Sequence, residues 1–187
     1  MEFKETLLPG CYEIQPTVFI DKRGKFVKIF HQEIFAEYGL HTEYAEAFYS
    51  ISKRRVLRGL HFQVPPYEQA KVVYCLAGKI LDAVVDLRIG SPTYGQQVTF
   101  ELNANQANMV YIPVGMAHGF YTLSDTALMV YNVTSVYSPE HDTGILWSSV
   151  EICWPDNEPI VSDRDAKFLP FASFLSPFHY QGVSHDG

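Results

Sequence analysis

The feature that most constrains the fold of this chain is a succession of short β-rich runs punctuated by Gly, Pro, Asn and Asp. β-rich runs favour extended backbone, and the residues between them favour turns. Strands are predicted over residues 26–29, 44–51, 56–62, 71–76, 79–87, 97–102, 108–112, 119–123 and 127–134. Many short strands at close spacing are typical of an all-β sandwich or barrel.

Two local signals add detail to this prediction. Gly78 can supply the positive φ of a tight turn, which predicts that the strands on either side of it form an antiparallel hairpin. Residues 32–38 carry Ile34, Phe35 and Tyr38 at helical spacing, and the glycine that follows can end a helix there.

The size and charge of the chain exclude several classes of protein. Its 187 residues fit one domain, and 47% hydrophobic against 19% charged residues supplies a core. The net charge of -7 argues against general binding to nucleic acids or anionic membranes. No secretory signal or membrane-spanning run is apparent. The cysteines, Cys11, Cys75 and Cys153, are odd in number and far apart, so we expect no disulfide framework and a cytoplasmic location.

The end of the chain and its aromatic residues leave alternatives open. Residues 168–180 are rich in Phe, Pro and Ser; this tail, through residue 187, either covers one end of the barrel or frays near Gly187. Aromatic residues make up 14% of the chain, either to pack the core and a dimer interface or to stack a base or sugar on faces such as Phe19, Phe26 or Tyr121.

His61 is a polar residue at the centre of a predicted strand, where a histidine is either a core residue or a functional one. Strict alternation divides the strand into one face with Leu57, Gly59, His61 and Gln63, and another with Arg58, Leu60 and Phe62. Arg58 therefore reaches the cavity of His61 only if the strand is distorted or at an edge.

His118 ends a Pro-x-Gly-x-x-His pattern that resembles the second motif of the cupin superfamily, a small double-stranded β-helix or jelly-roll barrel. In metal-binding cupins the first motif contains His-x-His, and here Gln63 stands in place of the second histidine. Two histidines and an amide are a poor ligand set for zinc, iron or manganese. We therefore expect no metal and no other cofactor.

Seven motifs, in order from about residue 9 to 170, resemble those of the dTDP-4-dehydrorhamnose 3,5-epimerase family. They are residues 19–24 (FIDKRG), 57–63 (LRGLHFQ), 86–88 (DLR), 91–95 (SPTYG), 112–120 (IPVGMAHGF), 137–141 (YSPEH) and 162–165 (SDRD). The resemblance implies a single metal-free cupin domain over residues 1–187 with a few short helices. It also implies a homodimer that inverts C3, C5 or both of a nucleotide-linked 4-keto-6-deoxyhexose in deoxysugar biosynthesis.

The resemblance assigns four catalytic residues. A C4 ketone acidifies the hydrogens on C3 and C5, so epimerisation needs a base, a cation for the enolate and an acid on the opposite face. By resemblance His61 is the base and Asp165 holds its tautomer. Lys71 stabilises the enolate, and Tyr137 is the acid. Without the resemblance, Asp165 reads as a helix cap or surface acid, Lys71 as a solvated charge and Tyr137 as a packed aromatic.

The resemblance also assigns residues that hold the nucleotide diphosphate. These are Arg23 and Arg58, together with His118 and Arg164, and guanidinium groups suit that role. Arg23 and Phe19 belong to an N-terminal segment of about residues 1–30 that, in this family, reaches into the partner subunit. Gln63 is a further residue that we expect to contact the substrate.

Three positions depart from the family pattern. Lys28 stands where the family often has Glu, and Glu46 and Phe48 replace a Gln-x-Asn pair. Thymine offers an N–H donor that a carboxylate accepts, whereas cytosine offers acceptors that an ammonium can donate to. This leads to the hypothesis that CDP replaces dTDP as the preferred nucleotide, unless Lys28 points to solvent.

Three alternatives remain open at the level of the sequence. Loss of the usual Asn at Phe48 is compatible with epimerisation at C3 only or C5 only. A metal-dependent cupin oxygenase or isomerase is disfavoured by Gln63. A non-catalytic sugar-nucleotide-binding cupin is disfavoured by the presence together of His61, Lys71, Tyr137 and Asp165, because binding alone does not require such a set.

Overall fold

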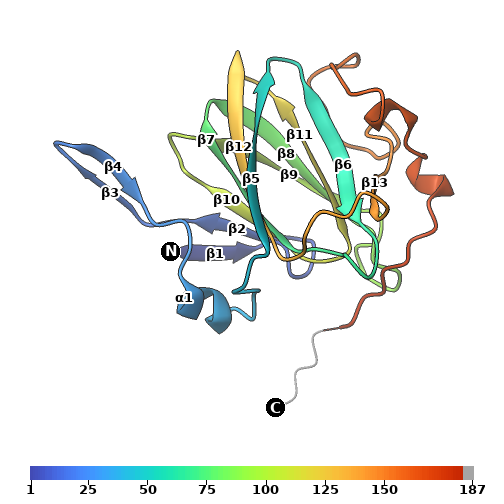
Figure 1. Cartoon of the computed structure of the whole chain (residues 1–187), viewed down its shortest axis with the longest axis horizontal. Coiled ribbons are helices and arrows are strands. Elements are labelled where there is room, and N and C mark those ends of the chain that lie inside the picture. The colour runs from blue at the N-terminus through green and yellow to red at the C-terminus, as the bar shows by residue number, and fades with distance from the viewer. Residues whose placement is uncertain (183–187) are drawn as a thin grey trace.

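A computed structural model describes residues 1–182, in which thirteen strands, one α-helix and two 3-10 helices are present (Figure 1). The strands are β1 (Glu2–Glu5), β2 (Tyr12–Gln15), β3 (Val18–Asp21), β4 (Gly24–Val27), β5 (Glu46–Lys53), β6 (Leu57–Gln63), β7 (Lys71–Ala77), β8 (Lys79–Asp86), β9 (Gln97–Asn103), β10 (Met109–Ile112), β11 (Met116–Thr122), β12 (Thr126–Val133) and β13 (Asp142–Gly144). The helices are α1 (Gln32–Glu37), η1 (Asp165–Lys167) and η2 (Phe171–Ser173).

Two antiparallel sheets face each other and form the barrel. One has the strand order β1-β2-β10-β7-β12-β5, and the other β13-β6-β11-β8-β9. Side chains from the two inner faces, among them Val73 and Met129 from one sheet and Val84 and Phe120 from the other, form a buried cluster. This alternation of inward apolar residues drives the two sheets together. The prediction of an all-β fold is confirmed.

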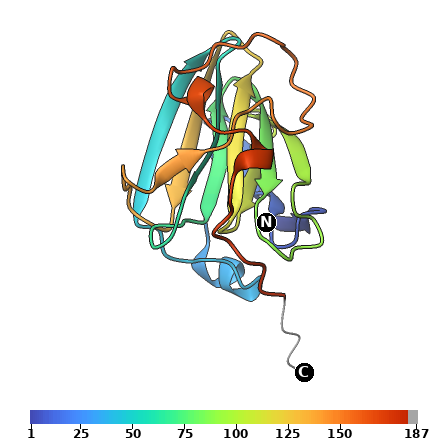
Figure 2. The same ribbon diagram turned by 90° about the vertical axis from the view of Figure 1, so that its right-hand side faces the viewer.

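Each sheet is also covered on its outer face. Helix α1 places Phe35 against Val72 and Met109 of the six-stranded sheet. The C-terminal segment crosses the outer side of the five-stranded sheet, where Phe174 and Phe178 pack against a cluster that includes Phe62 (Figure 2). The tail therefore covers the outer face of this sheet as far as Tyr180, whose backbone N–H donates to Ile89, and the alternative of fraying near Gly187 concerns residues outside those described.

The predicted hairpin at Gly78 is wrong. Strand β7 pairs with β10 and β12, whereas β8 pairs with β11 and β9, so the two strands belong to opposite sheets. Gly78 has the expected positive φ of 80°, and a Cβ there would lie 2.2 Å from the carbonyl oxygen of Thr126. Both strands direct apolar residues into the same interior, so the tight turn carries the chain from one sheet to the other.

The other predicted elements are found with shifts of a few residues. The strand predicted over 119–123 begins earlier, at Met116, so His118 lies inside β11. The helix is present, with Tyr38 as its C-cap and Gly39 at φ 66°. The sequence did not indicate β1, β2, β3 or β13, because strands of three or four residues are too short to show a recognisable hydrophobic period.

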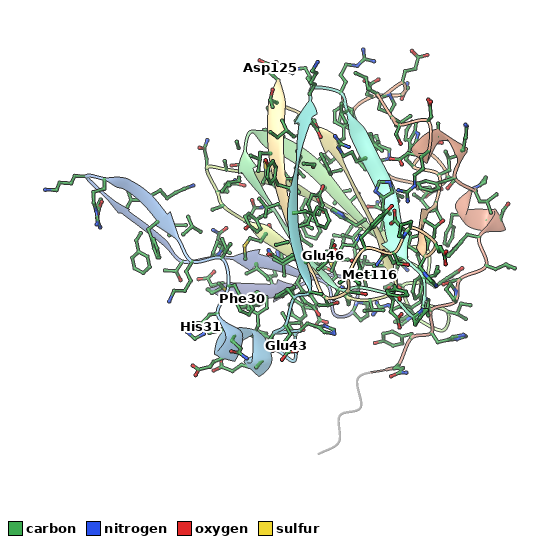
Figure 3. All side chains as sticks on the ribbon, viewed as in Figure 1. Phe30, His31, Glu43, Glu46, Met116 and Asp125 are labelled. Carbon is green, nitrogen blue, oxygen red and sulfur yellow. The ribbon has the colours of Figure 1, made fainter. Side chains whose placement is uncertain are left out.

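Strands β3 and β4 form a separate two-stranded arm that projects from the barrel (Figure 1). Side chains on the arm extend beyond the body of the chain, whereas Phe30 and His31 mark the return toward α1 (Figure 3). Phe19 and Phe26 pair across the arm with ring centroids 6.1 Å apart, and both are exposed by about three-fifths.

Candidate active site

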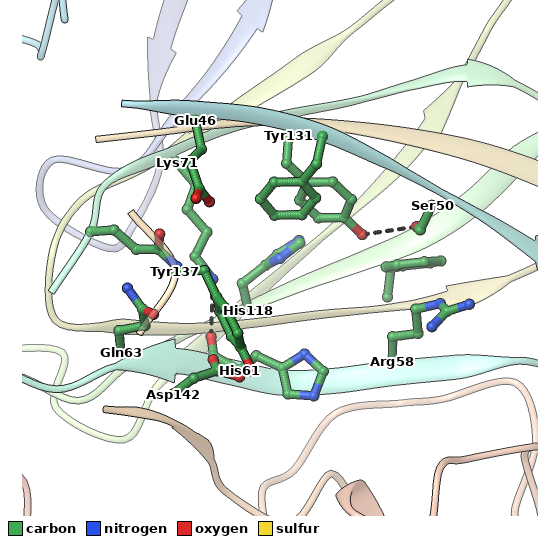
Figure 4. Close-up of a pocket in the computed structure, with 13 residues that line it drawn as sticks. Glu46, Ser50, Arg58, His61, Gln63, Lys71, His118, Tyr131, Tyr137 and Asp142 are labelled. Atoms are coloured by element: carbon green, nitrogen blue, oxygen red, sulfur yellow. Dashed lines mark hydrogen bonds between the residues drawn. The ribbon is translucent and has the colours of Figure 1, made fainter. Parts of the chain in front are cut away.

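A cavity of about 270 Å³ lies between the two sheets and is lined by residues of β5, β6, β7, β11 and β12 (Figure 4). Six of its lining residues come from the β6–β11–β13 side of the barrel: Arg58, His61, Gln63, His118, Phe120 and Asp142. The opposite side and the loops contribute Glu46, Phe48, Ser50, Gln69, Lys71, Tyr131 and Tyr137. The cavity thus joins imidazole, ammonium, guanidinium and phenol groups in one space.

A bulge in β6 brings Arg58 to the same side of the strand as His61. His118 pairs with His61 across the ladder, but Phe120 pairs with Arg58, so β6 contains one extra residue at this point. Gly59 has a φ of 137°, and a Cβ on it would lie 2.6 Å from the Cα of Gly119. The strand distortion that Arg58 requires is therefore present, and two glycines permit it.

His61 and Asp165 form a hydrogen-bonded pair at the cavity. The Nε2 atom of His61 lies 2.9 Å from Oδ1 of Asp165, and the backbone N–H of Gly59 donates to the other carboxylate oxygen at 3.1 Å. Burial would raise the pKa of Asp165, but the hydrogen bonds and charge of its partners outweigh burial and lower it. An ionised carboxylate only accepts, so the proton of neutral His61 is on Nε2 and the lone pair is on Nδ1.

Lys71 enters the cavity from the opposite sheet. Its ammonium donates to the carbonyl oxygen of His61 at 3.3 Å, and its side chain is buried. Burial lowers the pKa of Lys71 to about 8, although Asp142 and Asp82 act in the opposite direction. A partly desolvated cation of this kind interacts strongly with a negative charge that forms beside it.

His118, which the resemblance assigned to the nucleotide diphosphate, is a buried residue of the cavity. Its Nε2 is 2.7 Å from Oδ2 of Asp82, and both side chains are buried. Burial raises the pKa of Asp82, although the charges and hydrogen bond of His118 and the charge of Lys71 oppose the change. The site therefore has a second carboxylate–imidazole pair on its floor.

Tyr137 and Gln63 meet near the mouth of the cavity. Tyr137 is 58% exposed and lies on the segment between β12 and β13. Gln63 is buried, and its carboxamide bonds the backbone of Val136 and Ser138, the two neighbours of Tyr137. The mouth is flanked by Glu46 and by Phe48, whose ring stacks on Tyr131 with centroids 4.8 Å apart.

Comparison with known proteins identifies the group to which this arrangement belongs. A family model described as dTDP-4-dehydrorhamnose 3,5-epimerase matches residues 5–173. The chain is also 42% identical over 168 residues to the dTDP-4-dehydrorhamnose 3,5-epimerase of Shigella flexneri, which covers 88% of this chain and 93% of that protein. The chain belongs to the dTDP-4-dehydrorhamnose 3,5-epimerase family. It is a carbohydrate epimerase, as its motifs predicted.

Two further relatives extend the comparison. A dTDP-4-dehydrorhamnose 3-epimerase of Streptomyces niveus is 39% identical over 175 residues, covering 92% of this chain and 84% of that protein. The crystal structure of a 3,5-epimerase from Legionella pneumophila, in complex with dTDP-4-keto-L-rhamnose, has a TM-score of 0.91. It is 33% identical and covers 96% of this chain and 98% of that chain. The prediction of a cupin barrel is confirmed.

Not every residue that the epimerase motifs suggested lies at the cavity. Arg23 and Phe19 are on the arm, where Arg23 pairs with Asp21 at 2.6 Å, and Lys28 is exposed just beyond β4. Arg164 does not line the cavity either, because its guanidinium pairs with Asp142 at 2.6 Å and lies over the ring of Phe168.

Some residues of the epimerase cavity were missed by sequence reasoning. Asp142 directly follows the motif at 137–141, and its carboxylate holds Arg164 beside the cavity. Tyr131 lies in a strand that was predicted, and its hydroxyl is 3.4 Å from Ser50 Oγ. The alternation of Tyr131 with core residues along β12 was the one sequence signal for an inward side chain, and it does not distinguish a cavity from a core.

The motifs at 86–88 and 91–95 of the epimerase serve the fold rather than the cavity. The buried carboxylate of Asp86 accepts hydrogen bonds from the backbone N–H, Nε and Nη2 of Arg88 and from the hydroxyls of Ser91 and Thr93. These bonds fix the loop between β8 and β9.

No helix within residues 1–182 is long and apolar enough to cross a membrane. Over the same residues, no group of three or more His, Cys, Asp or Glu side chains is arranged to hold a metal ion. The cysteines at 11, 75 and 153 are all free thiols.

Proposed function

We propose that this epimerase inverts C3 and C5 of a dTDP-linked 4-keto-6-deoxyhexose, with His61 as the base. The observation that carries the proposal is the pairing of His61 Nε2 with Asp165 at the wall of a cavity that also contains Lys71 and Tyr137. The substrate class rests on the relatives, whose names specify dTDP-linked 4-keto sugars.

The first step is removal of a proton next to the ketone. Nδ1 of His61 takes the proton from C3 or C5, and the C–H electron pair forms a C=C bond while the ketone oxygen becomes negative. The ammonium of Lys71, which is held beside His61, stabilises that oxygen. Asp165 stabilises the imidazolium that forms, because its carboxylate already accepts from Nε2.

The second step returns a proton to the opposite face of the same carbon. The phenol of Tyr137 donates it, the enolate electrons form the new C–H bond, and the ketone is restored. Tyrosinate then regains a proton from water and the imidazolium of His61 loses one. The reaction is a balanced isomerisation, since no electrons leave the substrate.

The size of the cavity indicates how the substrate lies. At about 270 Å³ it is smaller than the pockets that hold drug-sized ligands, so it suits the sugar rather than the whole nucleotide sugar. A groove of about 620 Å³ lined by Glu46, Ala47, Phe48 and Tyr137 adjoins its mouth. We place the nucleotide along this groove, with Arg58 beside the diphosphate.

The remaining nucleotide contacts belong, in this proposal, to a partner subunit. Arg23 and Phe19 do not line the cavity of their own chain, and they lie at the arm of β3 and β4, which projects from the barrel and carries exposed aromatic faces (Figure 1). A homodimer in which each arm covers the partner's cavity would bring both residues to the nucleotide. Lys28 and Arg164 are weaker candidates for contacts with the nucleotide. Lys28 lies at the base of the arm, and Arg164 is held beside the cavity by its ion pair with Asp142. The free thiols suit the reducing cytoplasm, where we place the enzyme.

Proton NMR in deuterated water tests the proposal. With dTDP-4-keto-6-deoxyglucose we expect the signals at C3 and C5 to disappear as the epimerised product forms, and His61→Ala to abolish both losses. Exchange at one carbon only would identify a single-position epimerase, like the Streptomyces niveus relative. Faster turnover of the CDP-linked sugar would overturn the assignment of dTDP and support the hypothesis built on Lys28. Absence of exchange with both substrates would favour a non-catalytic binding protein.

A further inference from the structure

Arg58 differs from the other arginines of the chain in having no acidic partner. Its side chain lines the cavity (Figure 4), and among residues 1–182 no carboxylate forms an ion pair with its guanidinium. Each of the others pairs with a carboxylate of the same chain; they are Arg23, Arg54, Arg55, Arg88 and Arg164. Since a guanidinium is always protonated in proteins, Arg58 keeps its full positive charge for an anion that enters the cavity.

The guanidinium of Arg58 is nevertheless held in place, by two neutral acceptors on β5. Its Nε donates to the hydroxyl oxygen of Ser52 at 2.9 Å, and its Nη2 donates to the carbonyl oxygen of Ile51 at 3.4 Å. Over the described part of the chain its other N–H groups, two on Nη1 and one on Nη2, have no acceptor. Both terminal nitrogens can therefore donate to the oxygens of a phosphate.

Ser52 reaches Arg58 because the chain crosses from one sheet to the other between them. Ser52 lies near the end of β5, at the edge of the six-stranded sheet, whereas Arg58 is the second residue of β6 in the five-stranded sheet. Alternation along β5 places Ser52 on the same face as Ser50, which lines the cavity. The bulge beside Gly59 turns Arg58 to that side as well. The distorted strand and the serine thus act on one side chain.

Ser52 does not itself line the cavity. It is 3% exposed, whereas the side chain of Arg58 is exposed to solvent at the cavity wall. Without an acceptor beside it, a long exposed side chain samples many rotamers, and its ordering opposes the binding of a ligand. The hydroxyl of Ser52 removes part of that cost before the ligand arrives.

A hydroxyl also holds a guanidinium without neutralising it. A carboxylate at the same place would bind Arg58 more strongly, but it would cancel the positive charge at the cavity. An apolar side chain would leave the charge but not the order. A neutral acceptor is the side chain that preserves both.

We infer that Ser52 is a positioning residue for the nucleotide diphosphate, because its hydroxyl pre-orders the unpaired guanidinium of Arg58. The inference rests on the proposed function, in which Arg58 lies beside the diphosphate. Ser52 makes no contact with the substrate, and its effect on binding passes through Arg58. The effect is the same for dTDP and CDP, since both carry the diphosphate.

Four substitutions of Ser52 separate the hold from the charge. Ser52→Ala removes the acceptor, and Ser52→Cys is a second loss variant that leaves no space unfilled, because a thiol is a weak acceptor of similar size. Ser52→Thr keeps the hydroxyl. Ser52→Asp keeps an acceptor but neutralises the guanidinium. Ser176→Ala is the matched control, since Ser176 is also buried and donates to the carbonyl oxygen of Leu87, away from the cavity.

The measurement is the Kd of dTDP by isothermal titration calorimetry, with kcat and KM for the sugar substrate and thermal unfolding to identify folded variants. We expect Ser52→Ala and Ser52→Cys to raise the Kd by up to about tenfold, the cost of ordering one long side chain. KM should rise by a similar factor and kcat should fall much less. Ser52→Asp should weaken binding further, Ser52→Thr should restore it, and Ser176→Ala should leave it unchanged. In an Arg58→Ala background the loss of the hydroxyl should add nothing.

The inference and the proposed function fail in different ways. If Arg58→Ala leaves the Kd of dTDP and of CDP unchanged, the placement of Arg58 beside the diphosphate is wrong. If Arg58→Ala weakens binding while the folded loss variants of Ser52 bind as the wild type does, the hydrogen bond serves only to join the two sheets and the positioning role is overturned. Wild-type affinity in Ser52→Asp would also overturn it, because the unpaired charge would then have no effect on binding.

Discussion

Asp165 lies 104 residues beyond His61 in the chain, and yet its Oδ1 is 2.9 Å from Nε2 of the imidazole. The contact determines which nitrogen of His61 carries the proton. A carboxylate accepts only, whereas the carboxamide of an asparagine can also donate. In Asp165→Asn the side-chain N–H can donate to Nε2, which would move the imidazole proton to Nδ1 and remove the basic lone pair from the cavity.

We therefore expect Asp165→Asn to lower kcat by about 10,000-fold, the order found when the carboxylate of a serine-protease triad is changed in this way. Steady-state kinetics would measure it. Asp163→Asn is the matched control, because Asp163 is exposed on the same turn and should retain wild-type activity. Equal losses in the two variants would contradict the role given to Asp165.

The buried ammonium of Lys71 predicts the basic limb of the pH profile. Its pKa is lowered to about 8 by burial, so the charge that stabilises the enolate disappears as the pH rises through about 8. We expect kcat/KM to fall on this limb. In Lys71→Met the rate should be low at every pH and the limb near pH 8 should be absent. If the basic limb were unchanged in Lys71→Met, it would have to be assigned to another titrating group.

The lowered pKa of Lys71 also predicts how the stability of the fold changes with pH. Below pH 8 Lys71 is charged in both the folded and the unfolded chain, and the folded state bears the full cost of desolvation. Between about pH 8 and its ordinary pKa of 10.5, the unfolded chain binds more protons, so stability rises with pH. The free energy of unfolding should gain about 3 kcal/mol from this group over that window.

Urea denaturation at pH 7.5 and pH 10.5, for the wild type and Lys71→Met, isolates the effect. Other groups that titrate in this range contribute to both proteins and cancel in the difference. Relative to Lys71→Met, the free energy of unfolding of the wild type should increase by about 3 kcal/mol as the pH rises. A constant gap would mean that Lys71 keeps an ordinary pKa in the fold.

Substitution of Asp86 should lower the stability of the fold without changing the cavity directly, because Asp86 does not line it. Its buried carboxylate neutralises Arg88 and accepts from Ser91 and Thr93. Asp86→Asn leaves the guanidinium buried without its counter-charge, which costs about 3–5 kcal/mol. Urea denaturation would measure the loss. Asp125→Asn, which breaks the exposed pair with Arg54, should have little effect.

Much of the barrel could be predicted from local sequence, because most of its longer strands carry their own run of apolar and β-branched residues. The connection at Gly78 could not, since the same positive φ serves a hairpin and a crossing between sheets. Strand β1, with the sequence Glu-Phe-Lys-Glu, forms only because β2 offers it a partner. Whether such a segment becomes a strand depends on its pairing with a distant segment, and a local sequence pattern carries no information about that pairing.

The candidate active site likewise contains features that the sequence predicted and features that it could not predict. The roles of His61, Lys71, Tyr137 and Asp165 came from family resemblance, since nothing local connects residues so far apart. Alternation along β6 placed Arg58 on the wrong face, because a bulge adds one residue to the strand and shifts every side chain before it. The contacts of Gln63 with the Tyr137 segment depend on a loop conformation that no strand pattern reports.

The projecting arm of β3 and β4 leads to a prediction about subunits. If Arg23 of each chain serves the partner's cavity, an active site is built from two chains. A heterodimer of Arg23→Ala with His61→Ala then contains one site with both defects and one with neither. Two affinity tags would isolate that heterodimer after co-expression, and we expect about half of the wild-type activity per dimer.

A heterodimer of His61→Ala with Lys71→Ala is the matched control. Both substitutions lie in the barrel, so each of its two sites has one defective barrel and activity should stay at the level of the parent variants. The same low activity in the Arg23→Ala and His61→Ala heterodimer would show that arm and barrel of one chain act together. That result would contradict the proposal that the arm of each chain, with its exposed Phe19 and Phe26, covers the cavity of the partner subunit.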